Sequence, residues 1–249
     1  MAHYVDYSVM ERISVFCIPG PWSSRSELLA QVIRDSNGEY MFAGRLLVNT
    51  RLQEHVELEY CDHDPRMLEA FSAAGQGKLS EDVLKRIEEH KSVVYLITDL
   101  KIPAQREKLL RATSALENVG GIAIKVEAAG VAHEWHRWNE YLGIESGFGL
   151  YNALICLISD TDVFYSCGMH HFGLPEVSVP ASIGLEKGAQ VINAFNRYQI
   201  HEKPNLQEGH TFSLSEDGYR FKLSYDVDTR HDTEDLFNNP NGVWQLDLL

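Results

Sequence analysis

The stretch that decides the fold class is Met41–Tyr60, which reads MFAGRLLVNTRLQEHVELEY. It contains two runs typical of β-strands, around residues 41–48 and 56–60, with a short connection between them. A parallel pair of strands needs a crossover of a dozen or more residues, so these two strands are expected to be antiparallel. The stretch therefore favours an α+β fold over a doubly wound α/β fold.

The sequence on both sides of this stretch alternates apolar runs with helical patterns. Residues 13–18 predict a buried strand, and the capping-box spacing of Ser24 and Glu27 predicts a helix immediately after it. Further helices are expected at 65–74, from 80 onwards, at 103–116 and at 185–199, and further strands at 92–98, 122–126, 150–158, 162–167, 211–214 and 219–226. This pattern predicts mixed or antiparallel sheets with packed helices, arranged as two sheet-and-helix halves.

A glycine-rich run, Gly143–Gly149, is the best candidate for a boundary between the halves. It predicts an N-terminal α+β half at residues 1–143, a linker at 144–149 and a C-terminal α+β half at 150–249. The C-terminal half ends in an acidic tail, because the last 49 residues hold 10 Asp or Glu and 4 Lys or Arg.

Composition narrows the classes of function. The chain has 249 residues, of which 44% are hydrophobic, enough to build a sizeable core. Its 36 acidic and 22 basic residues give a net charge of -14, which argues against nucleic acid or anionic lipid as a partner and favours a basic protein partner.

The N-terminus resembles no secretory signal and no apolar run is long enough to cross a bilayer. We therefore expect a cytoplasmic protein without a membrane partner, whose four cysteines are free thiols.

Four motifs carry a resemblance to a known family. They are Ile18–Trp22 (IPGPW), Tyr60–Pro65 (YCDHDP), Ala74–Gly77 (AGQG) and Tyr165–Glu176 (YSCGMHHFGLPE). With these motifs the chain resembles an uncharacterised bacterial family known as domain of unknown function forty-two sixty-one. The resemblance implies a fold and a bacterial cytoplasmic setting but no reaction, because the family has no established activity. In the family pattern the last motif ends in Asp, where this chain has Glu176. Some relatives resemble neighbours of polymorphic toxin genes, which implies an immunity role.

The last motif also contains the most concentrated set of potential metal ligands. Cys167 and His170 have the C-x-x-H spacing that can place a thiolate and an imidazole on one zinc ion, with His171 and Glu176 close by in sequence. A second pair, Cys61 and His63, could complete such a site. The alternative interpretation is a strand end and turn near the surface, because two glycines and a proline interrupt the segment.

Two further segments carry weaker signals. Ser23, Ser24 and Arg25 lie at a predicted helix N-terminus and could bind an anion, although the segment is neither a P-loop nor a dinucleotide fingerprint. His133 and His136 lack the spacing of the zinc-protease motif, and we interpret their segment as an amphipathic helix that packs through Trp135 and Trp138.

The acidic tail contains a dense run of carboxylates without the spacing of a calcium-binding loop. We interpret it as a solvated loop that could serve as a landing surface for a cationic protein. Its five carboxylates are Asp226, Asp228, Asp232, Glu234 and Asp235. Since no catalytic motif can be assembled, the sequence favours a non-catalytic binding protein, of the immunity type that neutralises a basic toxin. The alternative is a metal-dependent enzyme of the hydrolase type, with zinc at the cluster of Cys167, His170 and His171.

Overall fold

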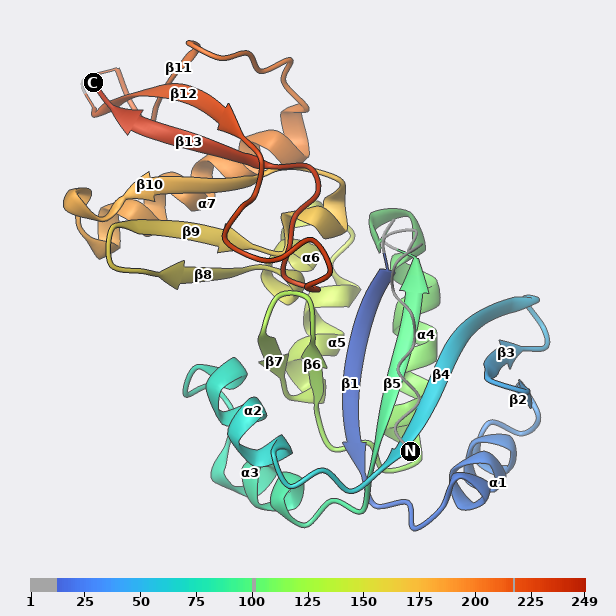
Figure 1. Ribbon diagram of the computed structural model, residues 1–249. Helices are drawn as coiled ribbons and strands as arrows, with labels where there is room; N and C mark the ends of the chain where they lie inside the picture. Colours follow the sequence, from blue (N-terminus) through green and yellow to red (C-terminus); the bar gives the residue numbers. More distant parts are fainter. Residues whose placement is uncertain (1–12, 100–101, 217) are drawn as a thin grey trace. The chain divides into compact units, whose positions relative to one another are not determined.

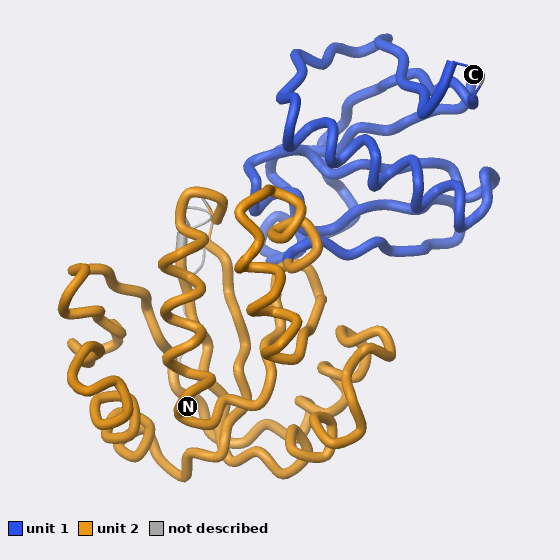
Figure 2. The backbone as a smooth tube through the Cα atoms, turned by 180° about the vertical axis from the view of Figure 1, so that it is seen from behind, with its two compact units in different colours: residues 1–10, 154–249 blue, residues 11–153 orange. Residues whose placement is uncertain are grey.

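The structure is a computed structural model and describes residues 13–99, 102–216 and 218–249 (Figure 1). The chain divides into two compact units, and the division in the sequence falls between Ala153 and Leu154 (Figure 2). Each unit has one sheet with helices in the same unit. The predicted α+β class, with two sheet-and-helix halves, is therefore confirmed.

The N-terminal unit is built on an antiparallel sheet. Over the described residues up to 153, its seven strands have the order β2-β3-β4-β5-β1-β6-β7. They are β1 (Ile13–Gly20), β2 (Tyr40–Ala43), β3 (Leu46–Asn49), β4 (Glu54–Asp62), β5 (Ser92–Asp99), β6 (Ile124–Val126) and β7 (Val131–His133). The decisive stretch is antiparallel as predicted, but residues 41–48 form two strands and not one. Gly44 causes this, because its φ of 64° makes the turn of the β2–β3 hairpin.

The helices of this unit are α1 (Arg25–Asp35), α2 (Met67–Gly75), α3 (Glu81–Glu88), α4 (Ile102–Asn118), α5 (Trp135–Gly143) and α6 (Gly147–Leu154). Two of them, α1 and α3, begin where the sequence places their serine caps. Ser24 Oγ accepts a hydrogen bond of 3.2 Å from the backbone N–H of Glu27, and Ser80 Oγ accepts one of 3.4 Å from Val83. Each serine thus satisfies an amide that has no partner within its helix.

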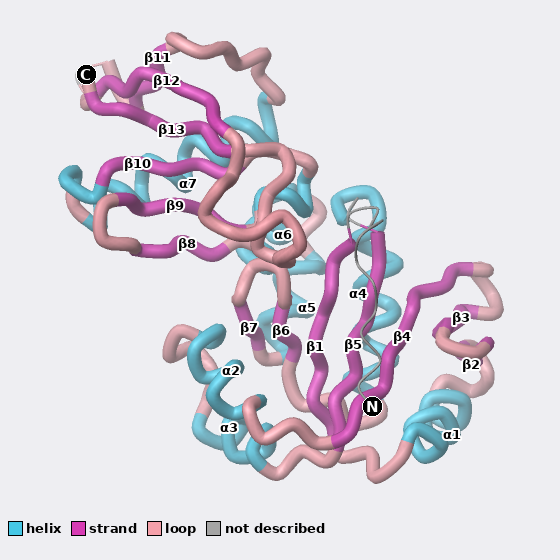
Figure 3. The backbone as a smooth tube through the Cα atoms, in the orientation of Figure 1, coloured by secondary structure: helices cyan, strands magenta, loops and turns pink. Residues whose placement is uncertain are grey.

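Helices pack against both faces of the first sheet (Figure 3). Cys17 of the central strand β1 belongs to a core cluster with Phe71 of α2 and Ile87 of α3. Its neighbour Phe16 points to the opposite face, where its ring meets Trp138 of α5 edge-on at a centroid distance of 5.7 Å. Burial on both faces explains why β1 is apolar almost throughout, without the alternation of a half-exposed strand.

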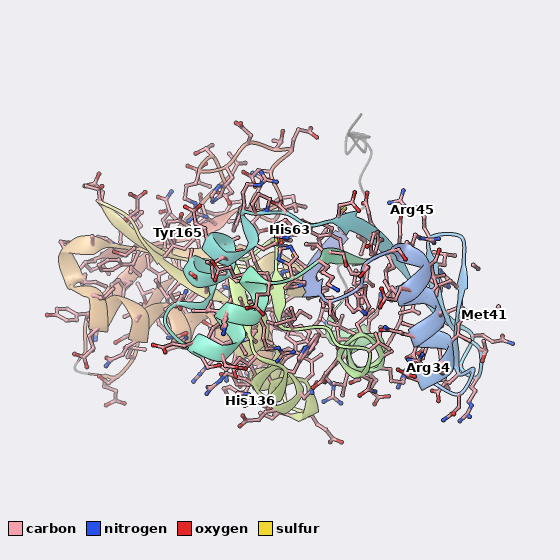
Figure 4. All side chains as sticks on the ribbon, turned by 90° about the horizontal axis from the view of Figure 1, so that it is seen from below. Arg34, Met41, Arg45, His63, His136 and Tyr165 are labelled. Carbon is pink, nitrogen blue, oxygen red and sulfur yellow. The ribbon has the colours of Figure 1, made fainter. Side chains whose placement is uncertain are left out.

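The segment around His133 differs from the prediction. His133 ends strand β7, and α5 begins only at Trp135, so the two histidines do not share a helix face. His133 is buried and hydrogen-bonds through Nε2 to the carbonyl of Ala153 at 2.9 Å, whereas His136 is exposed at the surface (Figure 4). The predicted aromatic packing of α5 is confirmed, because Trp135 and Trp138 are both buried.

The predicted linker is loop at residues 144–146 and helix at residues 147–149. Residues 144–149 run from the end of α5 into the first turn of α6, and the division between the units falls after Ala153. Gly149 is required by close packing and not by flexibility, since a Cβ at this position would collide with the carbonyl oxygen of Tyr141 and lie 2.8 Å from the Cβ of Ile144. A glycine that permits close packing and a glycine in a linker look alike in a sequence.

The C-terminal unit contains a mixed sheet. Among residues 154–216 and 218–249 its six strands have the order β11-β12-β13-β10-β9-β8. They are β8 (Cys156–Ser159), β9 (Val163–Cys167), β10 (Glu176–Pro180), β11 (Thr211–Ser213), β12 (Arg220–Asp226) and β13 (Val243–Leu248). β10 and β13 pair in parallel and the other neighbours are antiparallel. These two central strands were not predicted from the sequence, and residues 150–158 were predicted as one strand where α6 ends and β8 begins.

Helix α7 (Leu185–Glu202) packs against one face of this sheet, together with the short 3-10 turn Ala181–Ile183. The core between them consists of Val177, Val179, Val191, Ile192, Phe195, Phe221, Leu223, Trp244 and Leu246. The residues that alternate with these along the strands, such as Ser178 and its cross-strand partner Gln245, point to the other face. Figure 1 shows α7 behind the sheet and the segment between β12 and β13 in front of it. Within the described ranges, no helix has the length and apolar character needed to span a membrane.

Candidate functional site

The predicted metal cluster lies at the end of β9 and in the turn that follows it. Cys167 is the last residue of β9, His170 and His171 lie in the 3-10 turn Met169–Phe172, and Glu176 begins β10. The expected strand end and turn are present, but the expectation of a near-surface position is wrong. These four residues are at most 3% exposed. The segment between β12 and β13 contributes to this burial, because Asn239 hydrogen-bonds to the carbonyl of Leu174 at 2.9 Å.

Glu176 is the hydrogen-bonding centre of this cluster. Its Oε2 accepts a hydrogen bond of 2.7 Å from the hydroxyl of Ser166. Its Oε1 accepts hydrogen bonds from the backbone N–H groups of Gly168 at 3.0 Å and Met169 at 2.8 Å, and from Nδ2 of Asn239 at 2.9 Å. Two successive amides that converge on one oxygen form an anion-binding nest, which the φ of 115° at Gly168 makes possible. The carboxylate is therefore buried with four donors around it.

The two histidines lie beside this carboxylate. Their rings stack with a centroid distance of 4.3 Å, and His170 Nδ1 lies 3.7 Å from Glu176 Oε1, beyond hydrogen-bonding distance. Both ring nitrogens of His170 are buried without a hydrogen-bond partner among the described residues. Complete burial, with a smaller contribution from His170, holds the pKa of His171 well below its ordinary value. His171 is therefore neutral at physiological pH.

The thiol of Cys167 faces the neighbouring strand. Cys156 of β8 is its cross-strand partner, and a hydrogen bond between the two thiols, together with burial, raises the pKa of Cys167 far above that of a free cysteine. A protonated thiol is a poor nucleophile and a poor metal ligand. The four cysteines, Cys17, Cys61, Cys156 and Cys167, are all free thiols, as predicted.

Two of the four predicted zinc ligands already have hydrogen-bond partners within the protein. Glu176 already accepts four hydrogen bonds and Cys167 bonds to Cys156. Among the residues that the structure describes, no three His, Cys, Asp or Glu side chains are grouped so that they could hold a metal ion. The additional pair, Cys61 and His63, belongs to the N-terminal unit, where His63 Nδ1 lies 2.9 Å from the carbonyl of His90. The zinc site stays a prediction.

The acidic segment after β12 divides into exposed carboxylates and one buried carboxylate. Asp226, Asp232, Glu234 and Asp235 are exposed, in agreement with a solvated loop. For Asp228 the prediction of a solvated carboxylate is wrong. Its side chain is only 9% exposed, and it accepts hydrogen bonds from Arg230 Nε at 2.9 Å and from the backbone N–H of Asn239 at 3.2 Å. Burial is the largest single influence and opposes ionisation of Asp228, but the hydrogen bond and charge of Arg230, with the backbone N–H groups of Asn239 and Arg230, together outweigh it, so its pKa is lowered. Asp228 therefore stabilises the fold of this segment.

The guanidinium of Arg230 packs over the ring of Tyr165, with 4.2 Å between its carbon and the ring centroid. This cation–π contact attaches the acidic segment to β9, on the face of the sheet where Tyr165 lies. The carbonyl of Asp228 also accepts a hydrogen bond from Asn238 Nδ2 at 3.1 Å. The first contact thus binds the segment to the sheet, and the second joins the two ends of the segment to each other.

An acidic hollow of about 300 Å³ lies on the face of the sheet opposite α7. Its lining combines aliphatic and charged side chains from β9, β10, β12, β13 and the acidic segment. Four carboxylates and one guanidinium contribute to it, a net charge of three negative units at neutral pH. The charged members are Asp162, Asp226, Asp228, Arg230 and Asp247, and the aliphatic members outside the α7 core are Val163, Pro180, Val227 and Val243. Asp226 and Asp228 were predicted from the sequence as binding residues, whereas Asp162 and Asp247 were not.

The predicted anion site at the start of α1 is occupied by the protein itself. The backbone N–H of Ser23 donates to the carboxylate of Glu27 at 2.8 Å, and Ser24 caps the helix. Arg25 donates to the carbonyl of Gly44. These three residues therefore have structural partners, and anion binding there stays a prediction.

Several residues that organise the site had no local signal in the sequence. Ser166, Asn239 and Arg230 act through partners that are distant in sequence, such as Glu176, which lies 63 positions from Asn239. The composition of Asn238–Gly242 is typical of a turn. It does not indicate which carboxylates the amide groups of this turn contact. Structure was needed to bring the motif of residues 165–176 and the acidic segment together.

Comparison with known proteins identifies one relationship. No curated protein and no solved structure matches the chain. Residues 165–247 match the family described as Domain of unknown function (DUF4261). This segment begins at Tyr165 in β9 and ends at Asp247 in β13, so it contains the whole buried cluster and the acidic segment. The three N-terminal motifs lie outside it. The resemblance predicted from the last motif is thus confirmed, and residues 165–247 identify the C-terminal unit as related to this uncharacterised family.

Proposed function

We propose that this protein is a non-catalytic binding protein that captures a basic protein partner through the acidic hollow. An immunity protein that neutralises a basic toxin in the bacterial cytoplasm is the specific form of this proposal. The observation that carries it is the hollow, whose lining has four carboxylates and a single guanidinium that is already paired with Asp228. The net charge of -14 for the whole chain acts in the same direction, because it attracts a cationic partner over a longer range.

The chemistry of the hollow fits the side chains of lysine and arginine. Both have an aliphatic stem and a cationic head, and such side chains bury the stem against apolar surface while the head stays near charge or water. Val163, Pro180 and Val227 offer apolar surface, and Asp226 and Asp247 are exposed carboxylates of the same lining. A volume of about 300 Å³ is at the lower end of the range for small-molecule sites, which favours a single inserted side chain.

The remaining carboxylates of the segment have a different role in this proposal. Asp232, Glu234 and Asp235 are exposed and do not line the hollow. Such peripheral charges raise the association rate and contribute little to the dissociation rate. Capture thus proceeds by long-range attraction followed by insertion of a cationic side chain.

Two double variants with the same change in charge test the proposal. Asp226→Asn with Asp247→Asn removes two carboxylates from the hollow, and Asp232→Asn with Glu234→Gln removes two outside it. Binding of a lysine-rich and arginine-rich peptide, with a glutamine-substituted peptide as the control ligand, is measured by association and dissociation kinetics at two salt concentrations. We expect the hollow variant to weaken affinity about tenfold, equivalent to about 1.4 kcal/mol, mainly through faster dissociation. The outer variant should slow association at low salt only. Equal effects of the two variants would show that net charge alone acts and would refute the hollow as the site.

A second candidate is a metal-dependent enzyme of the hydrolase type, with zinc at Cys167, His170 and His171. The buried, unpartnered nitrogens of His170 favour it, because such groups ordinarily have a partner. Elemental analysis of the purified protein separates the two candidates. Stoichiometric zinc that is lost in His170→Ala would favour the enzyme, and a toxin gene directly beside this gene would favour immunity.

A further inference from the structure

The pairing of β8 with β9 places two thiols opposite each other. The hairpin turns at residues 160–163, where the backbone N–H of Asp160 donates to the carbonyl of Val163 at 2.9 Å. From this turn the register continues to the open end of the hairpin, where Cys156 and Cys167 are direct cross-strand partners. Directly opposite residues of antiparallel strands have Cα atoms about 4.5–5.5 Å apart, which lies within the range of a disulfide.

We propose that Cys156 and Cys167 form a reversible disulfide, and that this thiol pair is an oxidative modification site of the C-terminal unit. The thiols already contact each other, since Cys167 is hydrogen-bonded to Cys156. The bond needs no rearrangement of the sheet, because the register sets the backbone spacing. The site goes beyond the proposed function, because neither thiol lines the acidic hollow.

Access of the oxidant follows from the position of β8. Both thiols are buried, with Cys156 8% and Cys167 2% exposed, so oxidation in the closed state is slow. Among the strands of the described residues, however, β8 is the outermost in the sheet order and pairs with β9 alone. An edge strand can open locally without unfolding the core, and such opening exposes Cys156 at the end of the hairpin. Oxidation thus depends on fluctuation of the edge strand.

The chemistry is a two-electron oxidation by a peroxide or by a low-molecular-weight disulfide. With hydrogen peroxide, one thiol loses its proton, the thiolate attacks an oxygen atom and the O–O bond breaks. A sulfenic acid forms, and the hydroxide that leaves takes up the thiol proton to give water. The second thiol then displaces the sulfenic oxygen as a second water, which completes the S–S bond. With glutathione disulfide, two exchange steps give the protein disulfide and two molecules of glutathione.

Thiol counting on the full-length protein tests the proposal. The reduced protein is equilibrated with glutathione disulfide, denatured, and its thiols are counted after enzymatic removal of glutathione from mixed disulfides. We expect the count to fall from four to two, and a non-reducing peptide map to contain a peptide pair linked through Cys156 and Cys167. Variants Cys156→Ala and Cys167→Ala should retain three thiols, whereas Cys61→Ala, a control at a partly exposed cysteine, should still lose two. A wild-type count that stays at four, or a link through Cys17 or Cys61, would overturn the proposal.

Hydrogen exchange gives a second measurement that uses no variant. The disulfide closes the hairpin around the ten residues 157–166, so it should slow exchange of the amides in β8. Treatment with dithiothreitol should restore the original rate. Unchanged exchange in β8 between the oxidised and the reduced protein would contradict the assignment, even if two thiols had disappeared.

Discussion

Replacement of Glu176 by alanine should destabilise the C-terminal unit by about 3 kcal/mol or more. The carboxylate accepts hydrogen bonds from the Ser166 hydroxyl, from two backbone amides and from Asn239. Alanine removes all four acceptor contacts at a site that is 1% exposed, where water cannot replace them. The Ser166 hydroxyl can rotate, and Asn239 keeps its bond to the carbonyl of Leu174, so two backbone amides bear the main loss.

The magnitude follows from these two amides. An unsatisfied buried donor costs about 1–3 kcal/mol, so two of them cost about 2–6 kcal/mol. The relief of carboxylate desolvation offsets part of this loss, while the cavity left by the side chain adds to it. Glu176→Gln retains the shape and one carbonyl oxygen for the two amides, and its new NH₂ group can donate to Ser166 once the hydroxyl has rotated. It should therefore cost less, about 1–2 kcal/mol.

Urea denaturation followed by circular dichroism measures these differences, and native-state hydrogen exchange locates them. Exchange should accelerate in peptides that cover residues 163–180 before it changes elsewhere. Glu208→Ala is a matched control in the same unit, because Glu208 is exposed and its loss should change the free energy of unfolding by less than about 0.5 kcal/mol. A loss below about 1 kcal/mol for Glu176→Ala, or equal losses for the alanine and glutamine variants, would refute the role of Glu176 as the centre of the cluster.

Three further predictions follow from buried polar groups and from close packing. Burial lowers the pKa of His133 from 6.5 to about 4, so the unfolded state binds more protons between these values. The contribution of His133 to stability should therefore fall by about 3 kcal/mol as the pH is lowered from 6.5 to 4, and denaturation curves at several pH values should show a correspondingly smaller fall in His133→Gln. Gly149→Ala should lower stability by about 1–3 kcal/mol in the same assay, whereas Gly143→Ala, which has open space around it, should not. Asp228→Ala should cost about 2 kcal/mol in urea denaturation, because a guanidinium and a backbone amide lose their acceptor; a neutral effect would restore the view of a fully solvated loop.

Local features of the fold were predictable because their causes are local. Ser24 and Ser80 precede helices and satisfy amides three residues later, so the spacing of a few residues contained the whole interaction. The antiparallel class followed in the same way from the short connection inside Met41–Tyr60. The turn at Gly44 was not predicted, because a single glycine inside an apolar run can mark a bulge, a close packing contact or a turn.

Errors arose where the deciding partner is distant in the sequence. His133 was placed on a helix with His136, because the sequence gives little warning of a strand of three residues that ends at His133. Asp228 was taken for a solvated carboxylate, although Arg230 and Asn239 bury it against the sheet. In each case the local sequence showed which residue types are present but did not show which element packs against them.

The predicted metal cluster and the predicted acidic landing surface are parts of one hydrogen-bonded structure. Asn239 connects them, since its side chain donates to Glu176 and its backbone N–H donates to Asp228, which lines the acidic hollow. The carboxylate at the end of the YSCGMHHFGLPE motif therefore holds the segment that forms part of the hollow. A buried carboxylate with four donors is suited to fixing a loop and poorly suited to taking a metal or a proton. The family match begins at the first residue of this motif and ends at Asp247, another carboxylate of the hollow, so it contains the buried cluster, the acidic segment and the lining of the hollow except Asp162 and Val163. Under the proposed function, this motif positions the surface that captures a cationic partner.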